Sequence, residues 1–342
     1  MSTVEEKRES LNKYIKNIFI YYYMVKIAFW DNGLGERGTS VALYDYAHYN
    51  EVLLGNESII LYNNTHYSNK ADAIKKFTDR FNVISVNNWS KVDTILSQEK
   101  CDIIYIIKAG DYDGQLSKVC KNVVHCVFNC NSPHGQVYAS IAPWVNNNNG
   151  KYPYVPHIIN LPNHTENFRK ELNIPDNSCV FGRYGGYKQF DIPFVQKTVY
   201  AIAKANPHIY FLFMNTELFC NSLPNIIHLP MIIDLNIKTK FINTCDAMIW
   251  GRSDGEVYSL SQGEFSSKNK PILCTNIGYK GHVYKLGDKA IWYTNETDLS
   301  HIILSFDKDK MCKKDWNAYT DSTPEKVMKI FNDVFIQPCL TL

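Results

Sequence analysis

Two glutamates and two basic residues in the second half of the chain carry the clearest chemical signal. Glu256 and Glu264 are separated by seven residues in the stretch DAMIWGRSDGEVYSLSQGEFSSKNKPILCT. A pair of carboxylates offers strong hydrogen-bond acceptors to neighbouring sugar hydroxyls. Arg183 and Lys188 lie on the glycine-containing stretch VFGRYGGYKQFD, where two cations can neutralise a diphosphate. Solvated surface charge is the alternative for both pairs.

A glycine-rich loop near the start of the chain matches the pattern GxGxxG. Gly33, Gly35 and Gly38 follow the apolar run VKIAFW directly. A dinucleotide site also needs an acidic residue at the end of the second strand, about 20 residues further on. Here the strand SIILY ends in Tyr62 and two asparagines, which disfavours NAD. Two interpretations remain: a loop and helix N-terminus that bind an anion or a sugar, or a tight turn without a ligand.

The elements that must position these residues alternate between strand and helix. In the first half, helical stretches at residues 40–53 and 70–80 separate short apolar runs. Strands that alternate with helices form parallel βαβ units and a doubly wound sheet. We therefore predict strands at residues 25–30, 58–62, 82–86, 102–107 and 123–128.

The alternation breaks at residues 145–170, where an asparagine run is followed by several prolines. This composition predicts a loop and a crossing between domains. A second alternation then predicts a second doubly wound domain. Its predicted strands are residues 179–181, 209–214, 226–229, 246–250, 271–274 and 290–293.

The two glutamates fall at a position in this second sheet that suits a ligand. If a helix begins near Tyr258, Glu264 lies within its first two turns and Glu256 lies in the loop before it. Both then stand at the carboxyl edge of a parallel sheet, where ligands bind in such folds.

The two ends of the chain are predicted to be helical. Thr3 and Glu6 have capping-box spacing, and apolar residues follow at helical spacing up to residue 22. This helix either packs on the first domain or lies on a membrane surface. A last helix is predicted over residues 323–335. The predicted units are an appended helix at 1–23, a Rossmann-like domain at 24–165, a second Rossmann-like domain at 166–320, and a C-terminal helix at 321–342.

The composition is typical of a soluble globular protein. The chain has 342 residues, 45% hydrophobic and 20% charged, with a net charge of +2. This charge gives no broad attraction to nucleic acid, and no apolar run reaches the roughly 18 residues of a membrane span. We recognise no secretory signal, so we expect a cytoplasmic protein and leave open a peripheral membrane contact and the oligomeric state. Ten cysteines without a CxxC pair predict reduced, buried thiols rather than zinc ligands.

These motifs resemble those of the retaining, metal-independent GT-B glycosyltransferases of family 4. The E-x7-E motif of that family matches Glu256 to Glu264, and its G-R-x4-K motif matches Gly182-Arg183 to Lys188. The resemblance covers about residues 24–310 and is stronger in the second domain than in the first. It implies a GT-B fold, in which two doubly wound domains face a central cleft.

The resemblance also implies roles for the residues of the second domain. This domain would bind a nucleoside-diphosphate sugar, with UDP or GDP as the most common nucleotides and no metal or other cofactor. Arg183 and Lys188 would bind the diphosphate and stabilise the leaving phosphate electrostatically. Glu256 would contact hydroxyls of the donor sugar, and Glu264 would hold the nucleotide ribose.

In the first domain the resemblance is carried by the glycine loop and a histidine. Gly33 and Gly35, followed by Glu36 and Arg37, match a stretch that reads GG-x-E-R in many members. The first domain would supply the acceptor site. His134, in NSPHGQVY, stands where members often have a functional histidine. The alternative is a histidine satisfied within its own loop.

Three further features bear on which residues belong to the predicted site. Asp111 and Asp113 imitate the DxD metal motif of the other glycosyltransferase fold, but in a domain where that motif does not belong, so we predict a solvated loop. His125 lies inside a predicted strand and is assigned a structural role. Ser259 and Gln189 depart from the glycines common at those positions in the family, and neither change removes a charged group.

The predicted function is therefore transfer of a hexosyl group from a nucleotide sugar to a hydroxyl acceptor, with retention of anomeric configuration. The acceptor could be a glycan, a lipid-linked sugar, a protein or a small metabolite. The resemblance further implies that the last helix crosses back to the first domain, and that two hinged domains close over the substrates. Two alternatives stay open: a nucleotide-sugar-binding protein that has lost catalysis, and a nicotinamide-dependent oxidoreductase built on the glycine loop.

Overall fold

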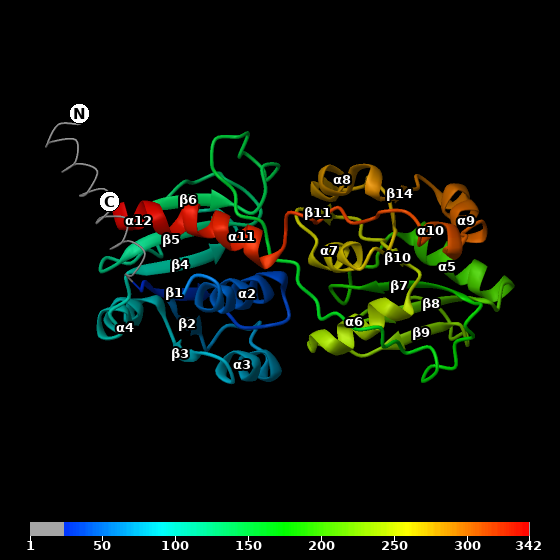
Figure 1. The fold of residues 1–342 in the computed structure, drawn as a ribbon, viewed down its shortest axis with the longest axis horizontal. Coiled ribbons are helices and arrows are strands. Elements are labelled where there is room, and N and C mark those ends of the chain that lie inside the picture. The colour runs from blue at the N-terminus through cyan, green and yellow to red at the C-terminus, as the bar shows by residue number, and fades with distance from the viewer. Residues whose placement is uncertain (1–23, 342) are drawn as a thin grey trace, which may run out of the picture.

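Two six-stranded parallel sheets, one in each half of the chain, form the framework of the protein (Figure 1). The computed structural model describes residues 24–341, so the helix predicted at residues 1–23 lies outside the described residues. The first sheet is ordered β3 (Asn82–Val86), β2 (Glu57–Asn63), β1 (Lys26–Asp31), β4 (Ile103–Lys108), β5 (Lys121–Cys126) and β6 (Val137–Ser140).

Central strands of the first sheet are apolar except at their ends, because helices cover both faces of the sheet. β4 reads IIYIIK, and all of its residues are buried, as expected for a parallel strand covered on both sides. On one face Tyr105 packs with Phe29, and on the other Ile104 and Ile106 pack with Trp30. The covering helices are α2 (Gly38–Val52), α3 (Ala71–Thr78) and α4 (Val92–Gln98).

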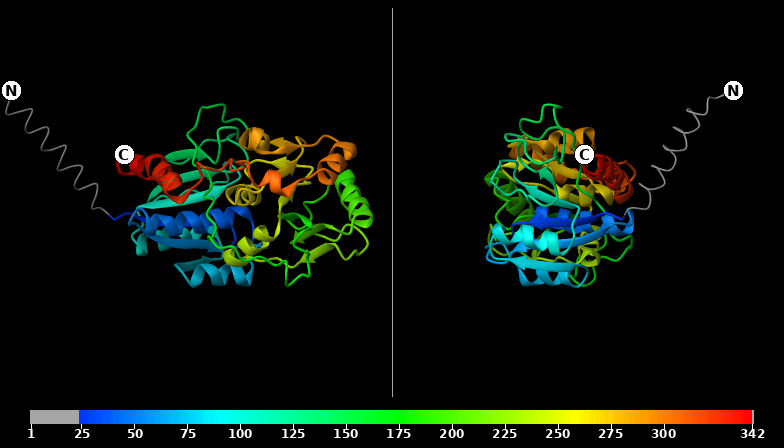
Figure 2. Two further views of the ribbon diagram at one scale, coloured as in Figure 1. Left: turned by 45° about the vertical axis from the view of Figure 1, so that its right-hand side comes forward. Right: turned by 90° about the vertical axis from the view of Figure 1, so that its left-hand side faces the viewer.

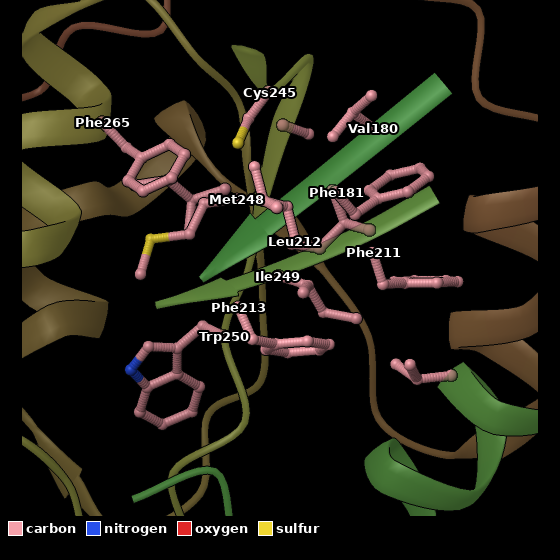
Figure 3. Packing of buried hydrophobic residues seen from close by; sticks show 14 of the residues in the cluster. Val180, Phe181, Phe211, Leu212, Phe213, Cys245, Met248, Ile249, Trp250 and Phe265 are labelled. Atoms are coloured by element: carbon pink, nitrogen blue, oxygen red, sulfur yellow. The ribbon is translucent and has the colours of Figure 1, made fainter. Parts of the chain in front are cut away.

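The second sheet repeats this plan with the order β14 (Ile291–Trp292), β12 (Ile272–Cys274), β10 (Ala247–Ile249), β7 (Cys179–Tyr184), β8 (Ile209–Met214) and β9 (Ile226–Leu229). Side chains of β7 and β8, among them Phe181, Phe211 and Phe213, pack in one core with Phe265 (Figure 3). Its helices are α5 (Pro193–Ala205), α6 (Leu235–Thr244), α7 (Leu260–Ser267), α8 (Gly281–Leu286), α9 (Glu296–Leu304) and α10 (Lys308–Met311). A separate two-stranded ribbon joins β11 (Gly255–Glu256) to β13 (Tyr279–Lys280).

The chain passes between the halves twice. The outgoing segment pairs with the returning segment where the amide of Ile159 donates to the carbonyl of Ser322 at 2.7 Å. After the second crossing, α11 (Pro324–Phe331) lies along the first sheet (Figures 1 and 2). There Phe331 stacks on Phe29 of β1 with ring centroids 6.3 Å apart. The core of the first half therefore contains residues from both ends of the described chain.

The predicted fold class, two Rossmann-like α/β sheets, is confirmed, and each predicted strand is present within a few residues of its predicted bounds. Some local predictions were wrong. β6 was not predicted, and Glu256 lies in the short strand β11 instead of a loop. The last helix is divided, because a π-helical segment (Asn332–Ile336) separates α11 from α12 (Gln337–Thr341). Within residues 24–341 no helix is both long and apolar enough to cross a membrane.

Candidate functional site between the two sheets

Segments that follow the strands of one sheet touch segments that follow the strands of the other. A methyl group added at Gly38, the first residue of α2, would lie 3.4 Å from the side chain of Leu260, the first residue of α7. Beyond β6, the indole of Trp144 donates to the carbonyl of Val257 at 2.8 Å. Ligands bind at the carboxyl edge of doubly wound sheets, so this junction is the place to look for a site.

Arg183 is a buried cation at the end of β7. Its guanidinium is 4% exposed and donates to Thr216 Oγ1 at 2.6 Å and to the carbonyl of Gly186 at 2.9 Å. Burial lowers the pKa of Arg183 to about 10, and the negative charge of Glu256 opposes this shift. Arg183 therefore remains positive at neutral pH in a fixed orientation. Lys188 lies on the following loop and is exposed.

Glu256 lies close enough to Arg183 for the two charges to interact. Its carboxylate accepts a hydrogen bond from Arg252 Nη1 at 3.1 Å and another from Trp250 Nε1 at 3.4 Å. Burial raises the pKa of Glu256, while Arg252 and Arg183 act to lower it. The structure thus brings together two of the residues predicted for the donor site, and Arg252 and Trp250 fix the carboxylate between them.

Glu264 lies in the second turn of α7, where the hydroxyl of Ser259 caps the start of the helix by accepting from the amide of Gln262. Both oxygens of the Glu264 carboxylate are engaged. Lys238 Nζ lies 2.9 Å from Oε1, and the hydroxyl of Tyr184 donates to Oε2. The glutamate side chain is only 9% exposed and that of Lys238 only 12%. Sequence reasoning missed both partners, because Lys238 belongs to no motif and Tyr184 occupies an unspecified position of the G-R-x4-K motif.

A carboxylate from the opposite half faces this pair. Asp45 projects from α2, and the charges of Lys76, Glu264 and Lys238 all act on it. Burial raises the pKa of Asp45 to about 7, with the negative charge of Glu264 adding to the shift and the two lysines opposing it. Charged groups of both halves are therefore close enough near Glu264 for their charges to interact. The sequence gives no sign of this cluster.

The glycine loop is closely packed against its own half of the protein. A methyl group at Gly33 would lie 2.6 Å from both His66 Nδ1 and Ser68 Oγ, and one at Gly35 would lie 2.5 Å from the carbonyl oxygen of Ser68. These distances are shorter than van der Waals contact. The backbone contact requires glycine at Gly35, whereas at Gly33 the side chains of His66 and Ser68 would have to move. A ligand role for either glycine remains a prediction.

The buried carboxylate of Asp31 holds the same loop through hydrogen bonds. Asp31, at the end of β1, accepts from Ser40 Oγ at 2.8 Å, and Ser40 in turn accepts from the amide of Gly35 at 3.2 Å. Burial raises the pKa of Asp31 to about 6. The loop that joins β1 to α2 is thus held by packing at Gly33 and Gly35 and by the hydrogen bonds of Ser40.

His134 presents one unpaired nitrogen. Its Nδ1 lies 2.5 Å from the carbonyl oxygen of Ser132, and this oxygen can only accept, so Nδ1 carries the proton. Its Nε2 is buried and has no partner among residues 24–341. Burial and the charge of Lys108 lower the pKa of His134, so the ring is neutral and Nε2 offers a lone pair. Its ring contacts are Tyr112 and Tyr138, both in the first half.

The other candidate acids and the second histidine have internal partners. Asp111 accepts hydrogen bonds from Asn129 and Asn131, and Asp113 pairs with Lys108 at 2.5 Å. His125 is fully buried between the hydroxyl of Tyr105 and the carbonyl of Ser140. No group of three or more potential metal ligands is present in the described part of the chain.

Comparison with known proteins places this geometry in a known fold. No family model and no curated protein matches the sequence. The structure is similar to Anabaena HepE in complex with UDP-glucose, with a TM-score of 0.65 and 13% identity over 90% of this chain and 98% of that one. It is also similar to a glycosyltransferase from Rickettsia africae ESF-5, with a TM-score of 0.66 and 13% identity over 92% and 100% of the two chains.

The same comparison includes a putative UDP-N-acetylglucosamine 2-epimerase from Listeria monocytogenes. Its TM-score is 0.58 and its identity 12%, over 92% of this chain and 98% of that one. At such identities the likeness concerns the fold. The protein has the GT-B fold, shared with a protein crystallised with UDP-glucose and with a glycosyltransferase.

Proposed function

We propose that this protein is a retaining glycosyltransferase that moves a sugar from a nucleoside-diphosphate sugar to a hydroxyl acceptor without a metal. The observation that carries the proposal is the grouping at the end of β7: buried Arg183 interacts with Glu256, and the neighbouring Tyr184 bonds to Glu264. Cation and carboxylates thus occupy the sheet edge where such folds bind ligands. UDP is the first nucleotide to test, since the similar Anabaena protein was crystallised with UDP-glucose.

In this proposal each group acts on a different part of the donor. Arg183 and Lys188 bind the diphosphate and stabilise the negative charge that develops as the bond from the sugar carbon to the phosphate oxygen breaks. Such preorganised charge is often the largest catalytic contribution, and it performs here the work that a metal performs elsewhere. Glu256 accepts hydrogen bonds from hydroxyls of the donor sugar, and Glu264 accepts them from the ribose.

The first half supplies the acceptor side. The acceptor oxygen bonds to the sugar carbon on the face that the phosphate leaves, and its proton passes to a phosphate oxygen. This route preserves the configuration, and it needs no carboxylate nucleophile of the kind that retaining glycosidases use. His134 offers the Nε2 lone pair to a sugar hydroxyl in the cleft.

Thermal stabilisation by nucleotides tests the donor site. We expect one of UDP, GDP and ADP to stabilise the wild type, by about 2.7 kcal/mol at 100 times its dissociation constant, and NAD to have no effect. Glu264→Ala should abolish this stabilisation, because the ribose loses its acceptor. Glu166→Ala is the control, since this glutamate is exposed on the outgoing crossing.

The outcomes separate the proposal from its rivals. Stabilisation by NAD alone would contradict it and restore the oxidoreductase. Nucleotide binding that Glu264→Ala leaves intact would place the nucleotide elsewhere. Binding without turnover of any UDP-, GDP- or ADP-sugar would identify a nucleotide-sugar-binding protein that has lost catalysis.

A further inference from the structure

We propose that a cavity between the two halves is a saccharide-binding subsite, which holds a neutral sugar unit of the acceptor away from the reacting hydroxyl. The acceptor role rests on the proposed function, whereas saccharide binding does not. The cavity has a volume of about 270 Å³, just below the roughly 300–1,000 Å³ of typical ligand sites. This size suits a small ring.

Both halves and both crossings build the cavity. The first half contributes the loop after β6, which includes Trp144, together with Tyr154. The second half contributes Tyr258 and, from α8, Tyr284. Its wall also includes residues of both crossing segments, Pro156 on the outgoing one and Asp321 on the returning one. In Figure 1, α8 and the end of β6 lie on the same side of the molecule, on either side of the boundary between the halves.

Two aromatic side chains at this cavity are largely exposed, and a third, Trp144, is partly buried. Tyr284 is 64% exposed and Tyr154 is 42% exposed, although large aromatic side chains are normally buried by folding. The rings of Trp144 and Tyr284 approach across the boundary, with centroids 6.0 Å apart and planes inclined by 36°. Their open faces are suited to the C–H bonds on the face of a sugar ring, since an aromatic face carries partial negative charge.

Trp144 is held by two hydrogen bonds, one to its indole ring and one to its backbone carbonyl. Its indole nitrogen donates to the carbonyl of Val257 at 2.8 Å, and its own carbonyl accepts from the hydroxyl of Tyr279 at 2.9 Å. Both bonds cross between the halves. The ring is therefore positioned before any ligand arrives, which reduces the entropy lost on binding.

The polar groups of the cavity favour a neutral ligand with hydroxyl groups. Lys285 Nζ lies 2.5 Å from Asp321 Oδ1, which also accepts from Ser322 Oγ at 3.0 Å. The Asp321 side chain is 58% exposed, so its carboxylate is open to solvent as well as to the cavity. The ion pair leaves the cavity without net charge from these two groups, and the exposed carboxylate has lone pairs that can accept from a hydroxyl.

The position of the cavity connects it to the acceptor. Tyr258 follows Glu256 by two residues, and Trp144 is bonded to the residue between them. The subsite therefore borders the end of β11, where Glu256 is proposed to bind the donor sugar. Because both crossings contribute to its wall, a bound saccharide would contact both halves and oppose their separation. The acceptor is thus inferred to be a saccharide of more than one unit.

Binding of named oligosaccharides to the full chain tests the subsite. Saturation-transfer NMR with cellotetraose, maltotetraose, chitotetraose and mannotetraose should detect at least one neutral ligand, with tetragalacturonate as the anionic comparison. Tyr284→Ala should weaken its binding by about fivefold to tenfold, whereas Tyr284→Phe should keep it within about twofold, because stacking needs the ring and not the hydroxyl. Leu304→Ala is the control, since Leu304 is as exposed but lies at the end of α9.

Several results would overturn the proposal. These are no binding of any neutral tetrasaccharide to the wild type, a preference for tetragalacturonate, or an equal loss in Tyr284→Phe or Leu304→Ala. Stabilisation by nucleotides is measured on the same variants and should be unchanged. If oligosaccharides bind through Tyr284 but no nucleotide stabilises the chain, the saccharide site stands and the transferase assignment fails.

Discussion

At the scale of single residues, the candidate donor site is defined as much by partners as by motif residues. The spacing of Glu256 and Glu264 and the pair Arg183 and Lys188 can be recognised from sequence because the residues of each pair are close along the chain. Lys238, the partner of Glu264, comes from another helix, α6, and is 26 positions away. No short pattern can reveal such a partner, since it depends on how α6 and α7 pack.

Lys238→Met tests the importance of this partner. The substitution leaves the Glu264 carboxylate in its nearly buried position with Tyr184 as its remaining partner. Removal of one member of a buried ion pair is strongly destabilising, so we expect a loss of about 2 to 4 kcal/mol in the free energy of unfolding. Nucleotide affinity should also fall, because the carboxylate is no longer held in one orientation. Urea unfolding and nucleotide titration measure the two effects.

A lysine on the same helix provides the control. Lys240 pairs with Glu171, whose side chain is 56% exposed, and exposed pairs contribute at most about 1 kcal/mol. Lys240→Met should therefore cost less than Lys238→Met and leave nucleotide affinity unchanged. Equal effects of the two substitutions would show that Lys238 has no special part in holding Glu264.

At the scale of elements, long apolar runs were the most predictable and short strands the least. β4 and β8 are recognisable because every or nearly every position is buried. β6 has four residues and follows the irregular stretch NSPHG, so its apolar content did not separate it from a loop. The glycine loop shows the opposite problem. The GxGxxG pattern was easy to recognise, but glycine is required both where the backbone packs against Ser68 and where it approaches a ligand. The pattern does not distinguish these two causes.

Two glycines of that loop make contrasting predictions. Gly35→Ala places a methyl group 2.5 Å from the carbonyl oxygen of Ser68, so the backbone must move, and we expect a loss of about 1 to 3 kcal/mol. Gly38→Ala meets only Leu260 at ordinary contact distance, and alanine favours the helix that begins there. That substitution should be neutral or stabilise by up to about 1 kcal/mol. Urea unfolding measures both changes in stability. A Gly35→Ala protein as stable as the wild type would contradict the close contact between Gly35 and the carbonyl of Ser68.

At the scale of the whole molecule, Asp45 of the first half lies within electrostatic range of charged groups of the second half. The residue lies on α2, while Glu264 and Lys238 belong to the second half. The facing of two domains across a cleft was implied by the family resemblance alone, and the two sheets followed from the strand–helix alternation. The facing of Asp45 and Glu264 did not, because it depends on how one half is oriented on the other, which leaves no periodic trace in the sequence.

Asp45→Asn should change how stability depends on pH. Burial raises the pKa of Asp45 from 3.8 to about 7, so the folded protein holds this proton more tightly than the unfolded chain. The contribution of Asp45 to stability is therefore present near pH 4 and is lost as the pH rises to about 7. We compare the free energy of unfolding of Asp45→Asn with that of the wild type at each pH. This difference should shift in favour of the variant by about 1 to 3 kcal/mol between pH 5 and pH 8. Urea unfolding at both values measures this, and an equal difference at pH 5 and pH 8 would contradict it.

The return of the chain to its first half has a consequence for synthesis. Phe29 of β1 stacks on Phe331 of α11, and Val327, Met328 and Phe335 complete the same core. A ribosome that has translated all strands of the first sheet has not yet made this cover, and the entire second half must be translated before it. The second sheet and its helices are complete on the nascent chain first, so the first half to be translated is the last to be closed.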